Sequence, residues 1–466
     1  MTITDYVNDS PLAFYYKTAR KYTIKLKDLT KGKPIKVICI FALPILIGSL
    51  FNLAYSLGDM KILGYYMGRD ALAAAGSVSG LYDLAGSFLM GLTNGFGVVT
   101  AMHYGSGNME KTRRNIAASL FFAFIVAAIF TLICMLFMNP ILDILNVPVN
   151  VRKDAYSYIM VMISGLIFSA LYNCLAASLR AVGDSYTPLI FLIISTVLNI
   201  ALDMFFVGFL RKGTFGAGLA TVISQIICLV ACIFYTFIRY KELRFRLKEM
   251  VPEKRSDARM LFSSGISMAL MSSMVQFGTL SLQSAINTLG ENIVVAHSAT
   301  RKLSGVFMLP FGVFGTAMAT YSGQNYGAGR YDRIKEGLKV TIIISYIYSA
   351  VCILVSYTIC PLLIQAIAST DQKDIIYNAV LYQKVDTLFY FVPAVIAIFR
   401  NSLQGMGEHR IPVISSAAEL IGKVLIALYL TPVLEYMGII LSEPIVWIIM
   451  VIPLILGMIK KMKRAG

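Results

Sequence analysis

Long apolar blocks recur along the chain, and they limit its fold more than any other feature of the sequence. A block of about 20 apolar residues forms a helix long enough to cross the roughly 30 Å hydrocarbon core of a bilayer. The blocks are continuous and do not alternate as barrel strands do, so helices are the expected spanning element. Only 14% of the 466 residues are charged, whereas ordinary soluble proteins carry about 25%. The sequence therefore predicts an all-α transmembrane protein.

The blocks predict twelve membrane-spanning helices, six on each side of a charged connector. A polar segment, residues 1–36, precedes the first span, and the connector covers residues 239–259. The predicted parts are therefore an N-lobe at 37–238, a C-lobe at 260–459 and a basic tail at 460–466. The predicted spans are 37–59, 71–103, 115–138, 156–178, 188–210, 216–238, 260–287, 294–322, 338–363, 377–400, 412–434 and 438–458.

Basic residues fall mostly on one side of this predicted topology. The net charge is +16, and Lys and Arg gather before the first span, in the connector and in the tail. They form no stripe with interleaved aromatic residues, so nucleic acid is not an expected partner. The positive-inside rule places both termini in the cytoplasm, in a multi-pass protein of the cell membrane. No cleavable signal sequence is expected, and an interfacial helix is expected near 11–22.

The two halves of the chain share sequence at a nearly fixed spacing. Tyr104-Gly-Ser-Gly107 corresponds to Tyr326-Gly-Ala-Gly329, and the offset in residue number is 326 − 104 = 222. Leu179-Arg-Ala-Val-Gly-Asp184 corresponds to Leu403-Gln-Gly-Met-Gly-Glu408, and for the prolines that follow the offset is 412 − 188 = 224. Six spans return the chain to its starting side, so the halves are parallel repeats. This predicts two six-helix lobes around a central cleft, an architecture typical of transporters.

An aspartate lies inside one of the apolar blocks. Asn199 and Asp203 stand four residues apart in the fifth predicted span, so a helix places them on one face. A carboxylate at such a depth costs about 2.5 to 3.5 kcal/mol on insertion scales, and it normally faces a bundle interior or a water-filled cavity. Asp203 is therefore either a structural carboxylate held by hydroxyls or amides, or one that binds and releases a cation. The second interpretation is favoured.

Together these residues resemble the multidrug and toxic compound extrusion (MATE) family, and the resemblance covers nearly the whole chain. It rests on Leu179-Arg-Ala-Val-Gly-Asp184 before Pro188, on Asn199 and Asp203, and on residues 216–225. The resemblance implies export of chemically varied, mostly cationic amphiphiles in exchange for H⁺ or Na⁺.

The resemblance also implies a cation site inside the N-lobe. The positions that match the family's acidic and amide residues there are Asp59, Asn199, Asp203, Thr221 and Asn173. One branch of the family has a further glutamate in the seventh helix and an aspartate in the tenth, where this chain has Val275 and Pro393. The chain therefore looks closer to the branch in which the N-lobe binds the ion.

Other charges inside the apolar blocks allow more than one interpretation. Glu419 and Lys423 stand at i and i+4 and are expected to neutralise one another. Arg301 and Lys302 are interpreted as residues that extend toward the end of the bundle. If they instead face the central cleft together with Asp83, they would suit an anionic or phosphate-bearing substrate.

The predicted function is multidrug efflux by cation-coupled antiport and alternating access. Binding of H⁺ or Na⁺ at Asp59 or Asp203 would remove charge, let a helix bend and weaken the hold on a cationic substrate. Such exchange requires only that ion and substrate differ in affinity for the two states. Pro44, inside the first span, is the hinge candidate, although a proline in a membrane helix is tolerated for many reasons.

The alternative is a flippase or exporter of a lipid-linked or anionic substrate. It would require Arg301 and Lys302 to face the cleft. No catalytic cluster, filter sequence or metal-ligand spacing of Cys and His is present, so neither an enzyme, a channel nor a cofactor is expected. The expected partners are small organic substrates and the lipid bilayer, and the protein is expected to act as a monomer.

Overall fold

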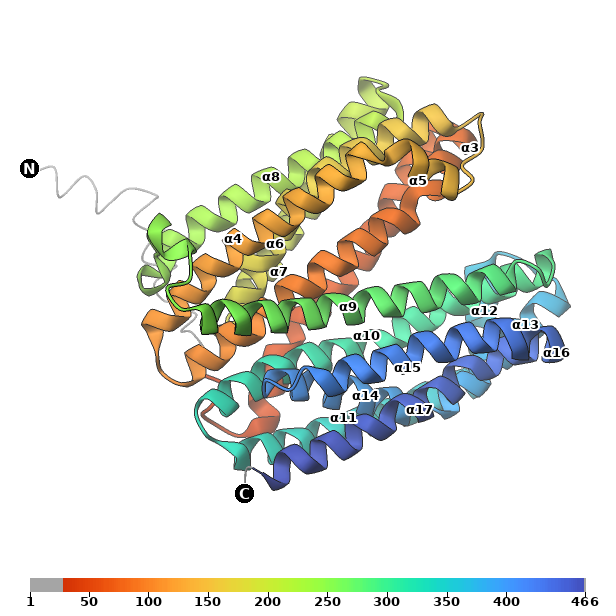
Figure 1. Ribbon diagram of the computed structural model, residues 1–466. Helices are drawn as coiled ribbons and strands as arrows, with labels where there is room; N and C mark the ends of the chain where they lie inside the picture. Colours follow the sequence, from red (N-terminus) through yellow and green to blue (C-terminus); the bar gives the residue numbers. More distant parts are fainter. Residues whose placement is uncertain (1–27, 465–466) are drawn as a thin grey trace, which may run out of the picture.

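Two bundles of helices make up the computed structural model, which describes residues 28–464 (Figure 1). Of residues 55–57, 59–63, 67, 69–70 and 247 only the backbone is described. The bundles touch at the side where the described chain begins and ends, and they diverge toward the opposite side (Figure 1). We call these the closed side and the open side. The interfacial helix predicted near 11–22 lies outside the described residues.

The first bundle is the N-lobe, in which a single helical element holds the first two spans. The chain reverses within this element at Gly68, whose φ of +76° is a conformation that residues with a Cβ rarely adopt. The N-lobe comprises α3 (Pro34–Gly105), α4 (Met109–Leu136), α5 (Met138–Ile144), α6 (Arg152–Ala181), α7 (Tyr186–Asp203), the π-helical η1 (Met204–Phe209) and α8 (Gly213–Arg239).

The second bundle is the C-lobe, which follows a connector with two short 3₁₀ turns, η2 (Lys241–Leu243) and η3 (Leu247–Met250). The tenth predicted span is broken here: α13 and α14 meet at 56°. Pro393 lies in the first turn of α14, where a residue without an N–H ends the hydrogen bonding of the preceding helix. The C-lobe comprises α9 (Arg255–Ile286), α10 (Glu291–Gly327), α11 (Tyr331–Thr358), α12 (Cys360–Ala368), α13 (Lys373–Leu388), α14 (Phe391–Gly405), α15 (Arg410–Leu425), the π-helical η4 (Ile426–Leu430), α16 (Thr431–Leu434) and α17 (Tyr436–Lys463).

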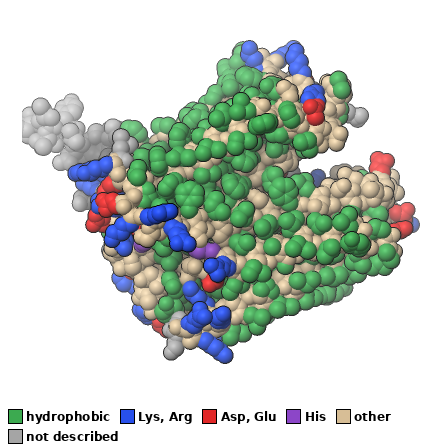
Figure 2. Space-filling view, viewed as in Figure 1, with side chains coloured by type: hydrophobic (Ala, Val, Ile, Leu, Met, Phe, Trp, Pro, Cys, Tyr) green, Lys and Arg blue, Asp and Glu red, His purple; other side chains and the backbone are tan. Residues whose placement is uncertain are grey.

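The helices form a membrane-spanning body. Within the described residues, 11 helices are long and apolar enough to cross a bilayer, or up to 12 when the bent pair α13 and α14 counts as one span. Hydrophobic side chains cover the flanks of both lobes, whereas charged side chains gather near the closed side and at the tips of the open side (Figure 2). The prediction of two multi-helix membrane lobes is confirmed.

Two glycines related by the repeat let the lobes touch at the closed side. A Cβ on Gly105 would lie 1.9 Å from the carbonyl oxygen of Gln324, and a Cβ on Gly327 would lie 2.0 Å from that of Met102. The contact is symmetric, because 327 − 105 and 324 − 102 both equal 222. Only a residue without a side chain permits such an approach of two backbones.

The segment before α3 strengthens the closed side. Leu29 is fully buried, and its N–H donates to Gln324 Oε1 over 2.9 Å. Gln324 Nε2 in turn donates to the carbonyl of Ala181 in the N-lobe over 2.7 Å. Asn325 and Arg333 of the C-lobe both donate to the carbonyl of Leu29 over 3.3 Å. The segment that precedes the N-lobe is therefore held by the C-lobe.

The connector that precedes the C-lobe is held, conversely, by the N-lobe. Glu249 in η3 forms an ion pair of 2.6 Å with Arg113 of α4, and Glu253 pairs with Arg114. Glu249 also accepts the backbone N–H of Arg246 over 2.8 Å. This backbone hydrogen bond and the Arg113 guanidinium hold the pKa of Glu249 below its ordinary value.

Candidate functional site

A small polar cavity lies inside the N-lobe, between α3, α6, α7 and α8. Its volume is about 150 Å³, and Asn and Ser side chains dominate its lining. Asn199 and Thr221 line it, and none of its described lining residues is charged. We call it the N-lobe cavity. It is a polar site within the membrane that has no fixed charge on its walls.

Asn199 connects this cavity to the buried Asp203, which is 1% exposed. With the amide oriented so that both of its ends are satisfied, its nitrogen donates to Asp203 Oδ2 over 2.9 Å. The amide oxygen then accepts from Thr221 Oγ1 and from the Thr221 N–H, both at 3.2 Å. The sequence prediction that Asn199 and Asp203 share one helix face is confirmed, and Thr221 of α8 completes the contact.

The backbone changes its winding directly after Asp203. The α-helix α7 ends at Asp203, and the π-helical η1 begins at Met204. Short π segments inside α-helices are rare overall and are frequent at functional sites. The carboxylate therefore lies at the junction between a regular α-helix and a π segment.

The remaining predicted site residues are Asp59, Asn173 and Pro44. Asp59 belongs to α3, but its side chain lies outside the described part of the structure, so its place beside Asp203 stays a prediction. Asn173 of α6 lines the N-lobe cavity, and its Nδ2 donates to Ser169 Oγ over 3.4 Å. Pro44 lies in an unbroken part of α3, since the non-helical residue inside that helix is Gly68. Its role as a hinge stays a prediction.

A larger cavity lies between the two lobes and adjoins the first. Its volume is about 440 Å³, and it is lined by α3, α6 and α7 of the N-lobe and by α10 of the C-lobe. The two cavities share Asn52, Tyr172, Asn173 and Leu192 in their linings. Among the described residues that line this interlobe cavity, Arg180 is the one with a charge. Arg180 belongs to the motif Leu179–Asp184, and the sequence predicted no separate role for it.

Arg301, Lys302 and Asp83, the three charged residues considered for the central cleft, have different surroundings. Arg301 lies in α10, and its guanidinium is directed at Glu443 of α17, with 3.2 Å between Nη1 and Oε1. The Arg301 side chain remains 41% exposed, so the interpretation that it extends toward the bundle end stays a prediction. Lys302 and Asp83 are exposed and line neither of the two cavities.

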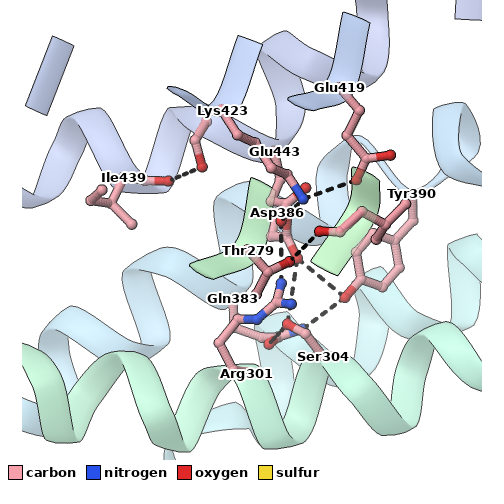
Figure 3. A network of polar contacts seen from close by, with 12 residues as sticks. Thr279, Arg301, Ser304, Gln383, Asp386, Tyr390, Glu419, Lys423, Ile439 and Glu443 are labelled. Atoms are coloured by element: carbon pink, nitrogen blue, oxygen red, sulfur yellow. Dashed lines mark hydrogen bonds and ion pairs between the residues drawn. The ribbon is translucent and has the colours of Figure 1, made fainter. Parts of the chain in front are cut away.

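Arg301 begins a chain of alternating charges through the C-lobe (Figure 3). Glu443 also pairs with Lys423 of α15 over 3.2 Å, and Lys423 pairs with Glu419 over 3.0 Å. Arg400 of α14 lies 4.0 Å from Glu419 at the other end. The predicted Glu419–Lys423 pair is confirmed, but it belongs to a network across four helices. We call these five residues the C-lobe ion-pair network.

A second set of polar groups adjoins this network (Figure 3). Asp386 of α13 accepts hydrogen bonds from Ser304 and from Tyr390, both at 3.4 Å. Ser304 also lies 2.9 Å from Gln383 Oε1. Sequence reasoning missed these residues, because single Ser, Gln and Tyr residues carry no spacing signal. These groups bind each other, but Asp386 Oδ1 is buried and has no hydrogen-bond partner among the described residues.

The two lobes therefore differ in what they can bind. Asp203, Asn199 and Thr221 offer carboxylate, amide and hydroxyl oxygens, the ligands that hard cations prefer. In the C-lobe, by contrast, Lys423 and Arg301 already neutralise Glu443. Within the described part of the chain, no group of three His, Cys, Asp or Glu side chains could hold a metal ion. The oxygen groups of the N-lobe adjoin a cavity whose described walls carry no charge.

Comparisons with known proteins agree with this two-lobed arrangement. The MatE family model matches residues 44–205 and again residues 267–430. The chain is 28% identical to the probable multidrug resistance protein YoeA of Bacillus subtilis, over 70% of this chain and 72% of that protein. It is 23% identical to the FAD transporter of Shewanella oneidensis, over 66% of this chain and 68% of that protein. A crystal structure of MATE in the bent conformation superposes with a TM-score of 0.87 at 18% identity, covering 95% of this chain and 98% of that one.

Proposed function

This chain belongs to the MatE family of multi-pass membrane transporters, and from that premise we propose that it is a multidrug efflux antiporter that exchanges amphiphilic, mostly cationic organic compounds for H⁺ or Na⁺. It is a transporter and not an enzyme. The observation that supports coupling to a cation is the contact of Asn199 with both Asp203 and Thr221, beside a cavity without charged walls.

Ion binding at Asp203 has a clear physical consequence in this setting. A buried carboxylate inside the membrane is costly unless a proton or a cation neutralises it. Asn199 and Thr221 can supply further oxygen ligands once the ion arrives, and Asp59 on the first helix is the proposed second carboxylate. The N-lobe cavity adjoins the interlobe cavity through Asn173, so occupancy of one changes the charge next to the other. Ion and substrate thereby favour different states.

The shape of the molecule supports alternating access. The interlobe cavity lies where the lobes begin to diverge, beyond the closed side with its Gly105 and Gly327 contacts. With both termini in the cytoplasm, as we propose, this state faces outward. The inward-facing state requires these contacts to separate, and Pro44, which lines the interlobe cavity, is the proposed flexible point. A single chain supplies both lobes, so the proposed unit is a monomer.

A second candidate function is the export of a lipid-linked or anionic substrate. Arg301 gives no support to an anionic substrate, because its guanidinium forms an ion pair with Glu443. What favours it is the single positive charge of Arg180 on the interlobe cavity. The relative from Shewanella oneidensis is named for FAD, a molecule that carries phosphate groups. Cation coupling at Asp203 is compatible with either class of substrate.

The test is substrate efflux driven by one imposed gradient at a time. Ethidium or norfloxacin is added outside everted vesicles that contain the wild type, Asp203→Asn or Asp143→Asn, under a pH gradient or a Na⁺ gradient. Uptake into these vesicles corresponds to efflux from the cell. Efflux driven by one gradient in the wild type identifies the ion. Asp203→Asn should lose this efflux while inserting normally, and Asp143→Asn, a surface carboxylate of the same lobe, should retain it. Equal efflux by the wild type and Asp203→Asn would contradict the proposal.

A further inference from the structure

Arg180 holds a central place between the lobes that cation coupling does not explain. It lies in the last turn of α6 and lines the interlobe cavity. It also lines a smaller cavity of about 50 Å³, toward which Asn94 of the N-lobe and Thr316 and Asn401 of the C-lobe are turned. Both lobes therefore enclose this guanidinium, although neither supplies an acidic residue to the lining of the two cavities.

The hydrogen bonds of Arg180 leave part of its guanidinium available. Nη2 donates to Asn94 Oδ1 over 3.1 Å, and no ion pair of Arg180 occurs among the described residues. Nε and Nη1 make no hydrogen bond with the described residues, and neither nitrogen is fully buried. These two donors are therefore accessible from the cavities. A guanidinium with two adjacent donors toward a cavity can form a bidentate contact with a carboxylate or phosphate.

The nearest acidic residue in the sequence does not neutralise Arg180. Asp184 accepts the N–H groups of Tyr186 and Thr187 at 3.1 and 3.0 Å, and it also accepts the hydroxyl of Tyr240. The carboxyl end of α6 offers only the partial negative charge of a helix terminus, roughly half an elementary charge. An arginine at this depth is normally paired with an opposite charge. A partner is thus missing from the protein's own side chains within the described range.

We propose that Arg180 binds the anionic group, a carboxylate or phosphate, of the transported molecule in the interlobe cavity. This rests on the proposed transport function and narrows its substrates to amphiphiles that include zwitterions. The anionic group lies on Arg180, and the cationic part extends through the shared lining at Asn173 toward the N-lobe cavity. The volume of about 440 Å³ is within the range of sites for drug-sized molecules.

Two dyes that differ in one group test this assignment. Rhodamine 110 carries a free carboxylate, and rhodamine 123 is its methyl ester with the same ring system. We would measure the binding of each dye to the purified, lipid-free protein by fluorescence anisotropy, without any ion gradient. The wild type should bind rhodamine 110 about tenfold more tightly, since a hydrogen bond to a charged group contributes about that much.

The variants separate binding by Arg180 from a structural role. Arg180→Gln should weaken binding of rhodamine 110 by about tenfold and leave that of rhodamine 123 unchanged, whereas Arg180→Lys should keep part of the preference. Arg152→Gln, which removes a partly exposed arginine of the same lobe, is the matched control. The proposal is overturned if Arg180→Gln loses affinity for both dyes equally, or if the wild type binds both dyes with the same affinity. If Arg180→Gln does not fold, the wild-type preference and its reduction in Arg180→Lys decide the question.

Two further measurements distinguish a substrate anion from a lipid headgroup, and anion binding from ion coupling. Displacement of rhodamine 110 from the wild type by phosphatidylglycerol micelles, with no effect of free inorganic phosphate, would assign Arg180 to a lipid headgroup and overturn the substrate assignment. Asp203→Asn should keep the dye preference although it is expected to lose coupled efflux. Loss of coupling and loss of the anion subsite are therefore read from different variants.

Discussion

The N-lobe and the C-lobe place different chemistry at equivalent positions of the repeat. Asn199 follows Pro188 by the same interval as Lys423 follows Pro412, and 443 − 221 and 438 − 216 both equal 222. The Asn199–Thr221 contact of the N-lobe thus corresponds to the Lys423–Glu443 ion pair of the C-lobe. A neutral amide–hydroxyl contact in one lobe has become a salt bridge in the other.

The backbone of the two lobes has diverged much less than these side chains. The π-helical η1 begins at Met204 and η4 begins at Ile426, where the offset 426 − 204 is 222. The offset between Asn199 and Lys423 is 423 − 199 = 224, because α15 has 16 residues and α7 has 18. Both π segments follow the helix that carries Asn199 or Lys423. The same irregular helix therefore supports an exchangeable ion in our proposal for the N-lobe and a fixed network in the C-lobe. A buried ion pair such as Lys423–Glu443 resists change, since removal of one partner leaves a buried charge.

The largest effect should come from breaking the C-lobe ion-pair network. Glu443→Gln leaves Arg301 and Lys423 without their shared carboxylate, and it should lower the free energy of unfolding by about 3 to 5 kcal/mol. Chemical unfolding in detergent measures this, with Glu291→Gln at the exposed start of α10 as the control. A loss below about 1 kcal/mol would show that the network does not stabilise the C-lobe.

The second effect comes from transferring the C-lobe pair into the N-lobe. Thr221→Glu buries a carboxylate that faces no lysine at position 199, so it should destabilise the protein. The double variant Asn199→Lys with Thr221→Glu should recover about 2 kcal/mol relative to the sum of the single changes, as contacting pairs do. Its ion-driven efflux should stay absent, because a fixed lysine replaces the mobile ion. Additive single changes would argue against the equivalence of the two positions.

A smaller effect is expected from removing the amide of the N-lobe contact. Asn199→Leu removes the hydrogen bond to Asp203 Oδ2 and that to Thr221, which should cost about 1 to 2 kcal/mol of stability. Ion-driven efflux should fall far more than stability does, since the amide is proposed to position the ion. The comparison variant is Asn150→Leu, an exposed asparagine in a turn of the same lobe. Wild-type efflux in Asn199→Leu would remove Asn199 from the site.

The smallest effect concerns how the connector is attached to the N-lobe. The pKa of Glu249 is lowered in the folded protein, so its contribution to stability is present above its unfolded pKa of about 4.3 and is lost as pH falls through the folded value. Glu249→Gln should therefore cost up to about 1 kcal/mol at pH 7 and nothing at a pH below the folded pKa. Unfolding curves of both proteins across this range measure the difference. Glu253→Gln, on a more exposed pair, should have a weaker effect.

The sequence contained the number and order of the spans but not the contacts between them. Apolar length, the constant offset between the repeats and the i, i+4 spacing of Glu419 and Lys423 are signals within the sequence, and each predicted a feature that the structure has. Arg301 and Glu443 lie 142 residues apart, and no local pattern joins them. This ion pair could not be predicted, because hydropathy does not reveal which face of a helix meets a buried carboxylate.

The candidate site likewise contains residues that local spacing predicts and residues that only contacts between helices reveal. Asn199 and Asp203 were predicted from spacing on one helix, and the contact of Asn199 with Thr221 from the resemblance. Arg180 received no role, because its neighbour Asn94 comes from another helix 86 residues away and the absence of an acidic partner is visible only in three dimensions. The bend between α13 and α14 was likewise missed, since the apolar run continues through it.

The position of Leu29 has a consequence for the order in which this protein can be assembled during synthesis. The hydrogen bonds that hold Leu29 come from Gln324, Asn325 and Arg333, which the ribosome adds much later, as the separation of 295 between Leu29 and Gln324 shows. The helices of the N-lobe can pack as soon as they are inserted, since their contacts are close in sequence. Leu29 must wait until α10 and the start of α11 are in place, so this contact joins nearly the first described residue to the second half of the chain only late in synthesis.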